Sequence, residues 1–343
     1  MLASRKVALI IGCNGMDGSL MCDLLLSKGY EVHGIIRRAS NFNTQRLEHI
    51  FHKMRLHYGD VTDAMSLLRT IQLVEPDEIY NFAAQSHVKV SCELENYTFQ
   101  ANTIGVLNVL QAVKTLGFDK RTKVYIASTS ETFGNVTDGT TLLTEKTEML
   151  PVSPYGISKL AAYHLSNYYR DAFGMFVVSS VLLNHEGPRR GHTFVTQKIA
   201  QHVGKYYKLS GKISPLQLGN LNAKRDWGNA EDYVYGVYLM LQHHTPDNYI
   251  LATGEEHSVR EFVELAFSNI GVIVHWEGER ERERGLDNTG KVLVEVNPKY
   301  YRPIDIHHLV GDYSKAKNVL GWEPKTSFPE LVKLMVDAAC SRN

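Results

Sequence analysis

The sequence has few cysteines and no surplus of charge of either sign, and each shortage excludes a class of protein. Its 343 residues contain four cysteines, Cys13, Cys22, Cys92 and Cys340, none of them in a CxxC pair. They are too few and too scattered for a disulfide framework, which fits a reducing cytosol. The 37 basic side chains balance 37 acidic ones. Because non-specific binding to nucleic acid requires an excess of Lys and Arg, no nucleic-acid partner is expected.

Long apolar runs are also absent. No stretch approaches ~18 uninterrupted apolar residues, so no membrane-spanning helix is expected. The first residues, Met1 to Lys6, lead straight into a strand-like segment and lack the basic and apolar regions of a signal peptide. At roughly 150 residues per domain, the chain corresponds to one large domain or two joined domains. We therefore expect a cytoplasmic globular protein with no membrane partner.

Strand and helix patterns alternate over the first half of the chain. Helical periodicity is clearest at Met16–Ser27, Tyr97–Thr115 and Tyr155–Phe173, and Gly29 suits the end of the first of these helices. Apolar runs typical of buried parallel strands are Val7–Ile11, Val32–Ile36, Met54–Tyr58, Glu78–Phe82, Val124–Ala127 and Phe176–Leu183. Such alternation predicts an α/β fold, a Rossmann-like, doubly wound parallel sheet with right-handed crossovers.

The alternation becomes less regular in the second half, which predicts a smaller mixed α/β domain at the C-terminal end. We expect residues 1–183 to form the Rossmann domain and residues 184–343 to form most of the second domain. A strand near 249–253 is expected to return to the first sheet. The charged run from Glu277 to Gly285 is typical of a solvated loop.

Helix signals in the second half are a periodic stretch at Thr193–Tyr207 and two Ser-x-x-Glu sequences, Ser258 to Glu261 and Ser327 to Glu330. In that spacing, the serine and the glutamate each bond the backbone N–H of the other at a helix N-terminus. Two further helices are therefore expected to begin at these serines.

A glycine-rich turn, Gly12-Cys-Asn-Gly-Met-Asp-Gly18, separates the first strand from its helix. Glycine lacks the Cβ that would keep a phosphate away, and the helix N-terminus supplies free N–H donors. No Gly-Lys-Ser/Thr follows, which disfavours a P-loop NTPase, while a purely structural βα turn is the plain alternative. The position after the first strand of an alternating series favours a dinucleotide site. The candidate contacts are Gly12, Asn14, Gly15, Met16, Asp17 and Gly18.

Two arginines follow the second strand, where a site for NAD has an acidic residue. That acid lies about 20 residues beyond the glycines and bonds the ribose 2′-hydroxyl. Arg37 and Arg38 occupy this place, and two guanidinium groups favour a 2′-phosphate. NADP(H) is therefore the expected cofactor, although a surface arginine pair would give the same pattern. After the third strand, Asp60 and Val61 are placed to touch an adenine, with an ordinary turn as the alternative for Asp60.

Tyr155-Gly-Ile-Ser-Lys159 opens a long helix. Residues four apart share a helix face, and a cation beside a phenol lowers the phenol pKa and makes it a base for a hydroxyl group. The spacing is common by chance, but here the fifth strand delivers Thr129 and Glu131 to the same carboxyl edge of the sheet. On an extended segment these two side chains point the same way, which places a second proton-transfer group in the same site.

Together these motifs resemble the extended short-chain dehydrogenase/reductases. Longer stretches are similar to the GDP-mannose 4,6-dehydratases over essentially the whole chain, most specifically Asn184-His-Glu-Gly-Pro-Arg-Arg-Gly191 and Lys224-Arg-Asp-Trp-Gly228. Further matching stretches are Thr193-Phe-Val-Thr196, Leu218-Gly-Asn-Leu221, Ala252-Thr-Gly-Glu255 and Tyr301-Arg-Pro303. The resemblance implies an NADP-dependent lyase that converts GDP-D-mannose to GDP-4-keto-6-deoxy-D-mannose and water, as in the biosynthesis of GDP-fucose or GDP-rhamnose.

The resemblance assigns the catalytic residues position by position. Tyr155, helped by Lys159, would take the proton of the mannose 4-hydroxyl as hydride leaves C4. Glu131 would remove the C5 proton and protonate the water that leaves C6, after which the hydride returns to C6. Thr129 and Ser130 would hydrogen-bond the sugar oxygens. The cofactor would not be consumed.

The resemblance also implies binding residues beyond those already named. For NADP(H), besides Tyr155 and Lys159, it adds Phe82, Ala83, Ala84, Gln85, Ser86, Tyr97, His185 and Arg190. For GDP-mannose it adds Ser86, Asn184, Val195, Lys198, Leu218, Asn220, Arg225, Arg302 and Asp305. Residues 1–183 would thus bind NADP and residues 184–343 mainly the GDP-sugar. The loop from Arg37 to Arg46 resembles a segment that touches a neighbouring subunit in relatives, so a homodimer or homotetramer is expected.

The chain departs from the family pattern without losing a catalytic residue. Leu-Tyr is usual at Thr132-Phe133, Ser at Gly187, Arg at Gln197 and Glu at Asp305. The changes at Gln197 and Asp305 affect the expected nucleotide affinity more than the reaction type. The changed residues after Glu131 could loosen the site and allow reduction of the keto product.

Three other functions fit parts of the sequence. A GDP-4-keto-6-deoxymannose reductase would give GDP-D-rhamnose, alone or as a side activity with NADPH, although Glu131 argues against a reductase alone. A catalytically silent NADP(H)-binding scaffold would not need Tyr155 and Lys159. A metal enzyme is disfavoured because the His243-His244 and His307-His308 pairs lack the His-Glu-x-x-His form, so no metal is expected.

Overall fold

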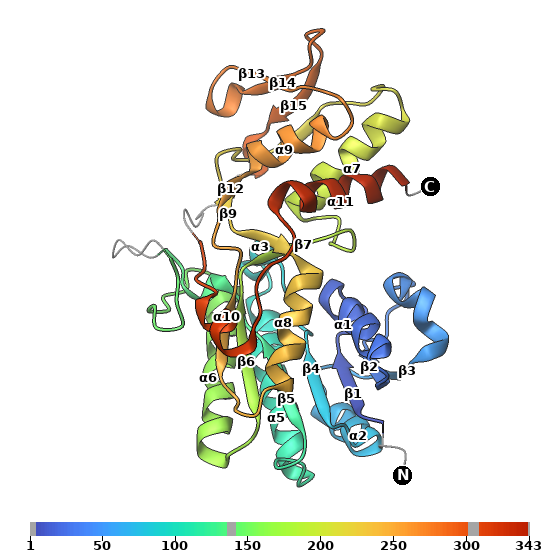
Figure 1. The fold of residues 1–343 in the computed structure, drawn as a ribbon, viewed down its shortest axis with the longest axis vertical. Coiled ribbons are helices and arrows are strands. Elements are labelled where there is room, and N and C mark those ends of the chain that lie inside the picture. The colour runs from blue at the N-terminus through green and yellow to red at the C-terminus, as the bar shows by residue number, and fades with distance from the viewer. Residues whose placement is uncertain (1–4, 136–141, 301–308, 342–343) are drawn as a thin grey trace. The chain divides into compact units, whose positions relative to one another are not determined.

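The computed structural model describes residues 5–135, 142–300 and 309–341, which form two compact units (Figure 1). The first unit comprises Met1–Leu183, Ala230–Leu251 and Asp312–Glu323. The second comprises Asn184–Asn229, Ala252–Gly311 and Pro324–Asn343. The chain therefore leaves the first unit after Leu183 and returns to it twice.

The first unit contains a seven-stranded parallel sheet with the strand order β11-β6-β5-β4-β1-β2-β3. Its strands are β1 (Val7–Ile11), β2 (Glu31–Ile36), β3 (Arg55–Tyr58), β4 (Glu78–Asn81), β5 (Lys123–Ala127), β6 (Val177–Leu182) and β11 (Asn248–Leu251). The predicted doubly wound α/β fold is confirmed. The chain first builds β2 and β3 on one side of β1 and then β4 on the other, so the strand order reverses beside β1. Open sheets bind ligands at the carboxyl ends of the strands around such a reversal.

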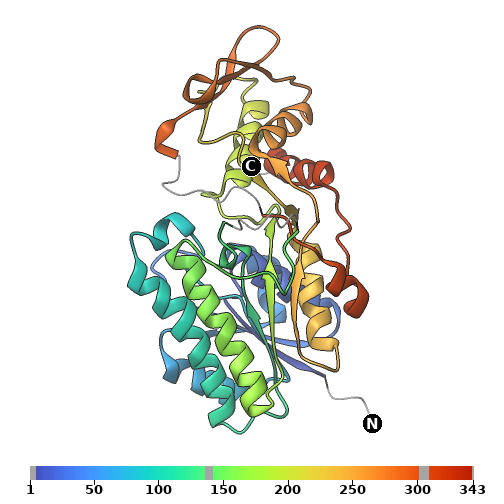
Figure 2. The ribbon, with the colours of Figure 1, turned by 90° about the vertical axis from the view of Figure 1, so that its left-hand side faces the viewer.

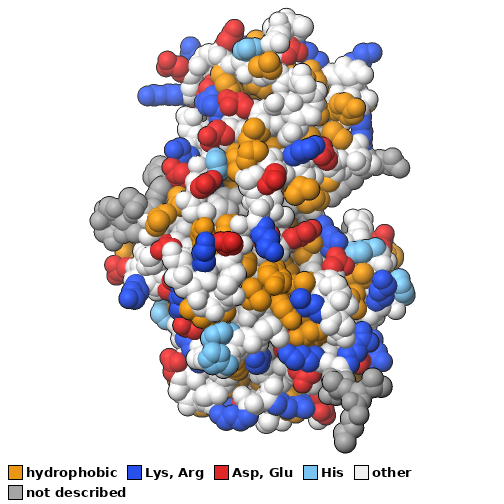
Figure 3. All heavy atoms as spheres, in the orientation of Figure 1, with side chains coloured by type: hydrophobic (Ala, Val, Ile, Leu, Met, Phe, Trp, Pro, Cys, Tyr) orange, Lys and Arg blue, Asp and Glu red, His pale blue; other side chains and the backbone are white. Residues whose placement is uncertain are grey.

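Helices cover both faces of this sheet. On one face α1 (Met16–Ser27) packs against α8 (Ala230–Gln242), and on the other α2 (Ala64–Val74), α5 (Gly105–Thr115) and α6 (Pro154–Phe173) pack in sequence (Figure 2). The apolar side chains between the sheet and this second layer are almost fully buried. Lys, Arg, Asp and Glu side chains are interspersed over the molecular face in Figure 3, as a net charge of zero suggests.

The helix predicted over Tyr97–Thr115 is not continuous, and this prediction is wrong in its middle. The chain forms α4 (Glu95–Phe99), then a π-helical turn at Gln100–Ile104, and only then α5. A π turn inserts an extra residue into the helix and so redirects the side chains around it. Here the turn carries the buried Asn102, whose side chain bonds Gln85 and Ser158. Apolar periodicity alone does not reveal such a local insertion.

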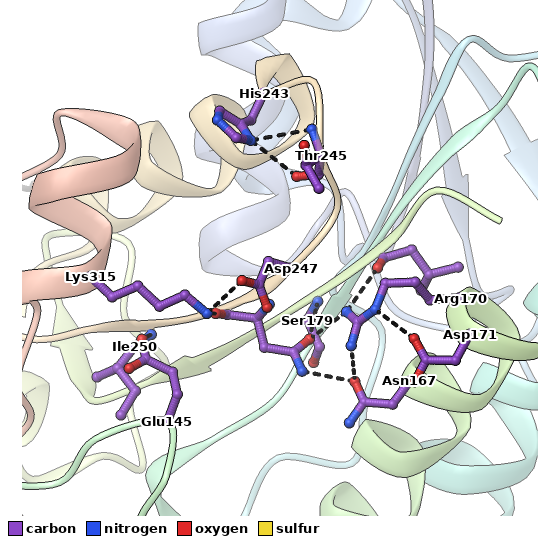
Figure 4. Close-up of polar contacts among 12 residues, drawn as sticks. Glu145, Asn167, Arg170, Asp171, Ser179, His243, Thr245, Asp247, Ile250 and Lys315 are labelled. Atoms are coloured by element: carbon purple, nitrogen blue, oxygen red, sulfur yellow. Dashed lines mark hydrogen bonds and ion pairs between the residues drawn. The ribbon is translucent and has the colours of Figure 1, made fainter. Parts of the chain in front are cut away.

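A buried amide attaches the returning strand β11 to the first unit. The Asn248 side chain, 6% exposed, accepts from Arg170 Nη1 (3.1 Å) and Ser179 N (3.3 Å) and donates to Tyr163 Oη (2.9 Å) and Asn167 Oδ1 (2.8 Å). Figure 4 shows the part of this network that involves Asn167, Arg170 and Ser179, with Lys315 of α10 (Ser314–Leu320) reaching the same strand. One side chain of β11 therefore satisfies donors and acceptors on both α6 and β6.

The second unit combines three helices with short strands. Strand pairs are β7 (Asn184–Glu186) with β10 (Trp227–Asn229) and β9 (Lys224–Arg225) with β12 (His257–Ser258), and a four-stranded sheet has the order β13 (His275–Glu277), β14 (Arg284–Leu286), β15 (Val292–Val296) and β8 (Leu216–Leu218). The helices are α7 (Val195–Lys208), α9 (Val259–Ser268) and α11 (Phe328–Ser341). Trp227, Phe262 and Phe328 lie within their shared apolar core.

Two helix starts of the second unit agree with their Ser-x-x-Glu sequences. At α9, Ser258 and Glu261 form the complete capping box. Before α11, the Glu330 carboxylate accepts from the backbone N–H and the hydroxyl of Ser327. These bonds involve only residues close in the chain, which is why the spacing alone predicts them.

The charged run 277–285 is not simply a loop, and this prediction is wrong in part. The run contains a 3₁₀ turn (Arg280–Arg282) and most of β14. Its one buried strand residue, Gly285, packs against Val274 and Trp276, where a Cβ would lie 2.8 Å from Val274 Cγ1. Because a glycine makes this contact, the strand carries little hydrophobic signal.

The remaining short elements of the described residues are 3₁₀ helices at Gln45–Lys53, Ser130–Thr132 and Pro298–Tyr300, and the helix α3 at Val88–Ser91. None of the helices in the described part of the chain has the length and hydrophobicity of a membrane span. The segments that follow β1, β4 and β5 at the carboxyl edge of the first sheet carry most of the candidate residues of that unit.

Replacing Asn248 by alanine is expected to lower the free energy of unfolding by about 3 kcal/mol, because several buried donors and acceptors lose their partner at once. Urea unfolding followed by circular dichroism measures this loss. Asp171→Asn is the matched control, since Asp171 is exposed and its ion pair with Arg170 lies at the surface, where such pairs contribute little. Equal stability of the Asn248→Ala variant and the wild type would contradict the anchoring role.

Candidate active site

The glycine turn after β1 is tightly packed and leaves the N-terminus of α1 without a side-chain cap. Gly12 has a φ of +82°, and a Cβ there would lie 2.9 Å from the backbone nitrogen of Ala83, while one at Gly18 would lie 2.3 Å from the oxygen of Gly12. The N-cap of α1 is Gly15, which has no side chain to bond the first N–H groups of the helix. These groups and the helix dipole are therefore left for an anion, and the turn fits the pyrophosphate of a dinucleotide.

The polar residues around this turn are tied to neighbouring segments. Asn14 donates from Nδ2 to the oxygen of Asn43 and accepts at its backbone oxygen from Arg46 Nη1, at 3.1 and 3.2 Å. At the end of β2, Arg37 and Arg38 are both exposed, and Arg37 Nη1 donates to the hydroxyl of Tyr97. Two of the predicted cofactor residues, Arg37 after β2 and Tyr97 on α4, thus lie in contact.

Asp60 and Val61 after β3 have local partners. The Asp60 carboxylate accepts from the N–H and hydroxyl of Thr62, at 2.9 and 2.8 Å, which is the geometry of an Asx turn. Val61 is buried, and a Cβ at Gly105 would lie 2.8 Å from its Cβ. The Asp60 side chain thus forms the ordinary turn that was the alternative to an adenine contact. Val61 packs closely on the start of α5.

The segment after β4 is held by a polar network that reaches α6. Gln85 N donates to Asn102 Oδ1 (2.8 Å), and Asn102 Nδ2 donates to Ser158 Oγ (3.0 Å). The Gln85 side chain bonds Thr98 and His87, so it supports the backbone. Around it, Phe82 packs on the ring of Tyr125, Ala83 and Ala84 are half-buried, and Ser86 is exposed. Ser86 is therefore the side chain of this segment with most access to a ligand.

The five residues expected to carry out the chemistry come from the segment after β5 and from α6. Ser153 caps α6 by accepting from Gly156 N at 3.0 Å, with Pro154 at the first helical position, so Tyr155 and Lys159 lie in the first turns. A Cβ at Gly156 would lie 2.6 Å from the backbone oxygen of Glu131. The start of α6 is thus in direct contact with the Glu131 backbone, which brings these residues together.

The segment after β5 is not extended, and the reason given for Glu131 from strand alternation is wrong. Ser130–Thr132 is a 3₁₀ turn, with Ser130 buried, and Thr129 caps it by accepting from Glu131 N at 3.3 Å. The turn, rather than a strand period, brings Thr129 and Glu131 to one place. Within the described residues, the buried Ser128 hydroxyl has no hydrogen-bond partner.

Lys159 is a buried ammonium with a fixed acceptor. Its Nζ donates to the oxygen of Ala127 at 2.8 Å, and the residue is 4% exposed. Burial lowers the pKa of Lys159 to about 8, and the negative charge of Asp17 opposes that shift. Asp17, in the glycine turn, therefore favours the charged form of the lysine. A cation held in a site of low polarity acts strongly on neighbouring groups.

In the second unit, the candidate residues lie on β7, α7 and β9. Asn184 and His185 belong to β7, whose residues pair with Trp227 and Gly228 of β10. Arg190 forms an ion pair with the buried Glu186 (3.0 Å) and stacks on Phe194. These contacts fix the guanidinium in place, so that a ligand would meet an oriented group.

Lys198, one turn after Val195 at the start of α7, has two partners. Its ammonium donates to the oxygen of Gln217 at 2.5 Å and lies 3.9 Å from the centroid of the Tyr300 ring. Burial lowers the pKa of Lys198, and Tyr300 opposes that shift. A Cβ at Gly219 would lie 2.8 Å from the oxygen of Tyr300, so the chain around Gly219 and Tyr300 is close-packed.

The remaining candidates for substrate binding differ in their burial and in their hydrogen-bond partners. Leu218 is buried, Asn220 accepts from Asn222 N at 3.0 Å, and Arg225 on β9 is 8% exposed. Arg302 and Asp305 lie outside the described residues. Gln197, where the family usually has Arg, is 2% exposed, and within the described chain its Oε1 has no hydrogen-bond partner.

Three polar residues with evident roles in these sites were missed by sequence reasoning. Asn102 is hidden in the π turn, Tyr300 directly precedes the Tyr301-Arg-Pro303 stretch, and Asp226 follows Arg225 in one of the most specific motifs. The motifs themselves were therefore the signal for Tyr300 and Asp226. In the described residues, no group of three or more His, Cys, Asp or Glu side chains could hold a metal ion.

The chain is similar to known proteins over nearly its whole length. The family model described as GDP-mannose 4,6 dehydratase matches residues 9–335. A GDP-mannose 4,6 dehydratase of Cricetulus griseus is 50% identical over 97% of this chain and 91% of its own, and one of Sinorhizobium fredii is 48% identical over 98% and 97%. Among solved structures, the UDP-glucose 4-epimerase of Thermus thermophilus in complex with NAD has a TM-score of 0.82 at 27% identity, covering 98% of this chain and 99% of that one.

Replacing Lys159 by methionine is expected to abolish activity and yet stabilise the fold by about 1–3 kcal/mol at neutral pH. The reason is that a pKa lowered from 10.5 to about 8 corresponds to about 3 kcal/mol against the charged form. Unfolding in urea over a range of pH measures the difference.

The sign follows from proton binding. Below pH 8 the folded wild type holds a buried charge, and between about pH 8 and 10.5 the unfolded state binds the additional proton, so wild-type stability rises. The advantage of the Lys159→Met variant should therefore shrink across that interval. Lys53→Met, at the exposed end of the 3₁₀ helix Gln45–Lys53, is the control and should stay within about 0.5 kcal/mol of the wild type. A variant less stable than the wild type at pH 7 would refute the account.

Proposed function

The chain belongs to the GDP-mannose 4,6-dehydratase family, and we propose that it converts GDP-D-mannose to GDP-4-keto-6-deoxy-D-mannose and water. One observation supports this reaction above all. The start of α6 contacts the Glu131 backbone, so that a carboxylate residue accompanies the Tyr155–Lys159 pair. Oxidation alone needs the tyrosine and the lysine, whereas elimination of water needs this additional proton-transfer group.

The proposed cofactor is a nicotinamide dinucleotide, NADP(H). The tight turn at Gly12 and the uncapped N-terminus of α1 suit its pyrophosphate, and Arg37 and Arg38 suit a 2′-phosphate that an acid would repel. When bound, the cofactor supplies reversible hydride transfer to and from the sugar. Lys159 is the residue that we assign to the nicotinamide ribose as well as to the phenol of Tyr155.

Each catalytic residue has one proposed task. Tyr155, which lies one helical turn before the buried Lys159 ammonium on α6, accepts the proton of the 4-hydroxyl. The resulting ketone makes the C5 hydrogen acidic, and Glu131 removes it and then protonates the departing 6-hydroxyl. Thr129 and Ser130 hold the sugar oxygens through their hydroxyl groups. All of these groups move protons or hold oxygens, and none becomes covalently attached to the sugar.

The second unit supplies the proposed contacts to the GDP group. Two phosphates call for several cations, and Lys198, Arg225 and Arg302 are the candidates that we assign to them. Lys198 is held by Gln217 and Tyr300, and Arg225 is largely buried, so both are oriented before a ligand arrives. Pre-oriented charges bind with a smaller loss of side-chain freedom than exposed ones.

The relatives named above are both dehydratases, which favours dehydration over the reductase alternative. We also propose a cytoplasmic location, supported by the balanced composition, and assembly into a homodimer or homotetramer, supported by the resemblance of the loop from Arg37 to Arg46 to a subunit-contact segment. Size-exclusion chromatography with light scattering distinguishes these two assemblies from a monomer.

An isotope experiment tests the proposed reaction. GDP-mannose carrying deuterium at C4 should give a product with deuterium at C6 and with no net consumption of NADP, because the same hydrogen is removed and returned. Mass spectrometry and NMR of the product locate the label. Deuterium in the solvent or on free coenzyme, or a failure to form the keto-sugar, would contradict the proposal.

The variant Glu131→Gln separates the two halves of the reaction. It retains Tyr155 and Lys159 for oxidation but cannot remove the C5 proton, so the rate of water loss is expected to fall by at least about a hundredfold. Reduced nicotinamide should then accumulate on the enzyme in a single turnover, which its absorbance reveals. Thr132→Ser, the next residue in the same turn, keeps the hydroxyl that donates to the oxygen of Thr129 and is the control.

Cofactor preference is expected to depend on Arg38. The variant Arg38→Ser should bind NADP about 10- to 100-fold more weakly, because it loses a charge-assisted bond to the 2′-phosphate, with little change for NAD. Isothermal titration of the cofactor-free protein with each dinucleotide measures both affinities. Arg69→Ser removes the same charge from the exposed part of α2 and should change neither. Unchanged NADP affinity in Arg38→Ser would show that the preference lies elsewhere.

A further inference from the structure

Asp226 is a fully buried carboxylate whose partners come from two distant stretches of the second unit. The residue is 0% exposed. Oδ1 accepts from the N–H and the hydroxyl of Thr253 at 2.8 and 2.7 Å, and Oδ2 accepts from Gly254 N at 3.1 Å and Gly311 N at 3.2 Å. Three of these four partners are backbone N–H groups, which can only donate, so the arrangement requires two accepting oxygens.

The residues on both sides of this carboxylate form a small scaffold. Arg225 lies opposite His257 in the antiparallel pair of β9 and β12, and Lys224 Nζ forms an ion pair with Glu256 at 2.9 Å. The Asp226 bonds to Thr253 close the same loop from its other end. The backbone that carries Arg225 is thus held on both sides by the segment 253–258.

The apolar core does not by itself fix this loop. Trp227, the next residue, is buried and stacks on Phe328 with an interplanar angle of 10°, which anchors the chain after Asp226. Before Asp226 the chain has polar partners instead, and Arg225 Nη1 donates to the oxygen of Lys224. The segment 253–258 therefore holds the backbone of Lys224 to Asp226, from which the Arg225 side chain extends.

We propose that Asp226 is a positioning residue that holds Arg225 in the orientation in which its guanidinium binds the diphosphate of the GDP-sugar. This inference rests on the proposed function, in which Arg225 is a diphosphate ligand. The groups proposed to react, Thr129, Glu131 and Tyr155, belong to the first unit. A contact to the diphosphate is made equally in the ground state and the transition state, so its loss raises KM and leaves kcat nearly unchanged.

The test uses the full-length protein with GDP and GDP-mannose. In Asp226→Asn one oxygen becomes an NH2 group that faces an N–H donor, so the Kd for GDP and the KM for GDP-mannose should rise about tenfold while kcat stays within about twofold. Thr253→Val removes the hydroxyl that donates to Asp226 and that also bonds the backbone of Glu255 at 3.3 Å, and it should raise both constants about threefold. Thr253→Ser keeps that hydroxyl and should have wild-type values.

A destabilised variant of the same unit distinguishes the proposed positioning role of Asp226 from a merely structural one. Glu330→Ala removes the bonds to Ser327 at the start of α11 and should lower the melting temperature without changing the Kd for GDP. The role of Asp226 would be overturned if both Asp226→Asn and Thr253→Val bound GDP like the wild type, or if Glu330→Ala weakened GDP binding as much as they do. If the wild type bound GDP but released no keto-sugar, that result would contradict the proposed function. The Kd values of the variants for GDP would still test the role of Asp226.

Discussion

The bond from the Lys159 ammonium to the carbonyl of Ala127 is the interaction on which the proposed catalytic site of the first unit depends. It joins the end of β5 to the first turns of α6 at 2.8 Å, inside a region where burial lowers the pKa of the lysine to about 8. Such a charge is unfavourable for folding and valuable for chemistry, because it acts on its neighbours without screening by water. The positions of Tyr155, Thr129 and Glu131 are set by the two segments that this bond connects.

Support behind the proposed reacting groups comes from buried residues on neighbouring elements. Asn102 in the π turn links the segment after β4 to α6, and Gly156 allows the helix to contact the backbone of Glu131. The second unit follows the same principle with Glu186 holding Arg190 and Asp226 holding the loop of Arg225. In each case a buried group orients a side chain of the proposed sites. An oriented side chain loses less conformational entropy when a ligand binds.

Several features could be predicted from residue patterns because they depend on local chemistry. The bounds of α1 and its end at Gly29, with a φ of +82°, follow from periodicity and from the need for a residue without Cβ. The capping box of Ser258 and Glu261 likewise involves only neighbours. The prediction of a continuous helix over Tyr97–Thr115 was wrong because a π turn interrupts it. That turn contains Asn102, whose hydrogen-bond partners lie on other elements. In the candidate site, spacing and family resemblance identified Glu131 but did not reveal that a 3₁₀ turn, rather than strand alternation, places it.

What the sequence determined by itself was therefore the parallel α/β class and the glycine turn, because these depend on composition and short-range order, and the candidate reacting groups, which spacing and the resemblance to a known family identified together. The tertiary structure alone decided that Lys159 is buried on the Ala127 carbonyl, that Asn248 attaches β11, and that Asp226 joins Thr253 to Gly311. Those partners are far apart in the chain, and only packing in three dimensions determines which donor meets which acceptor.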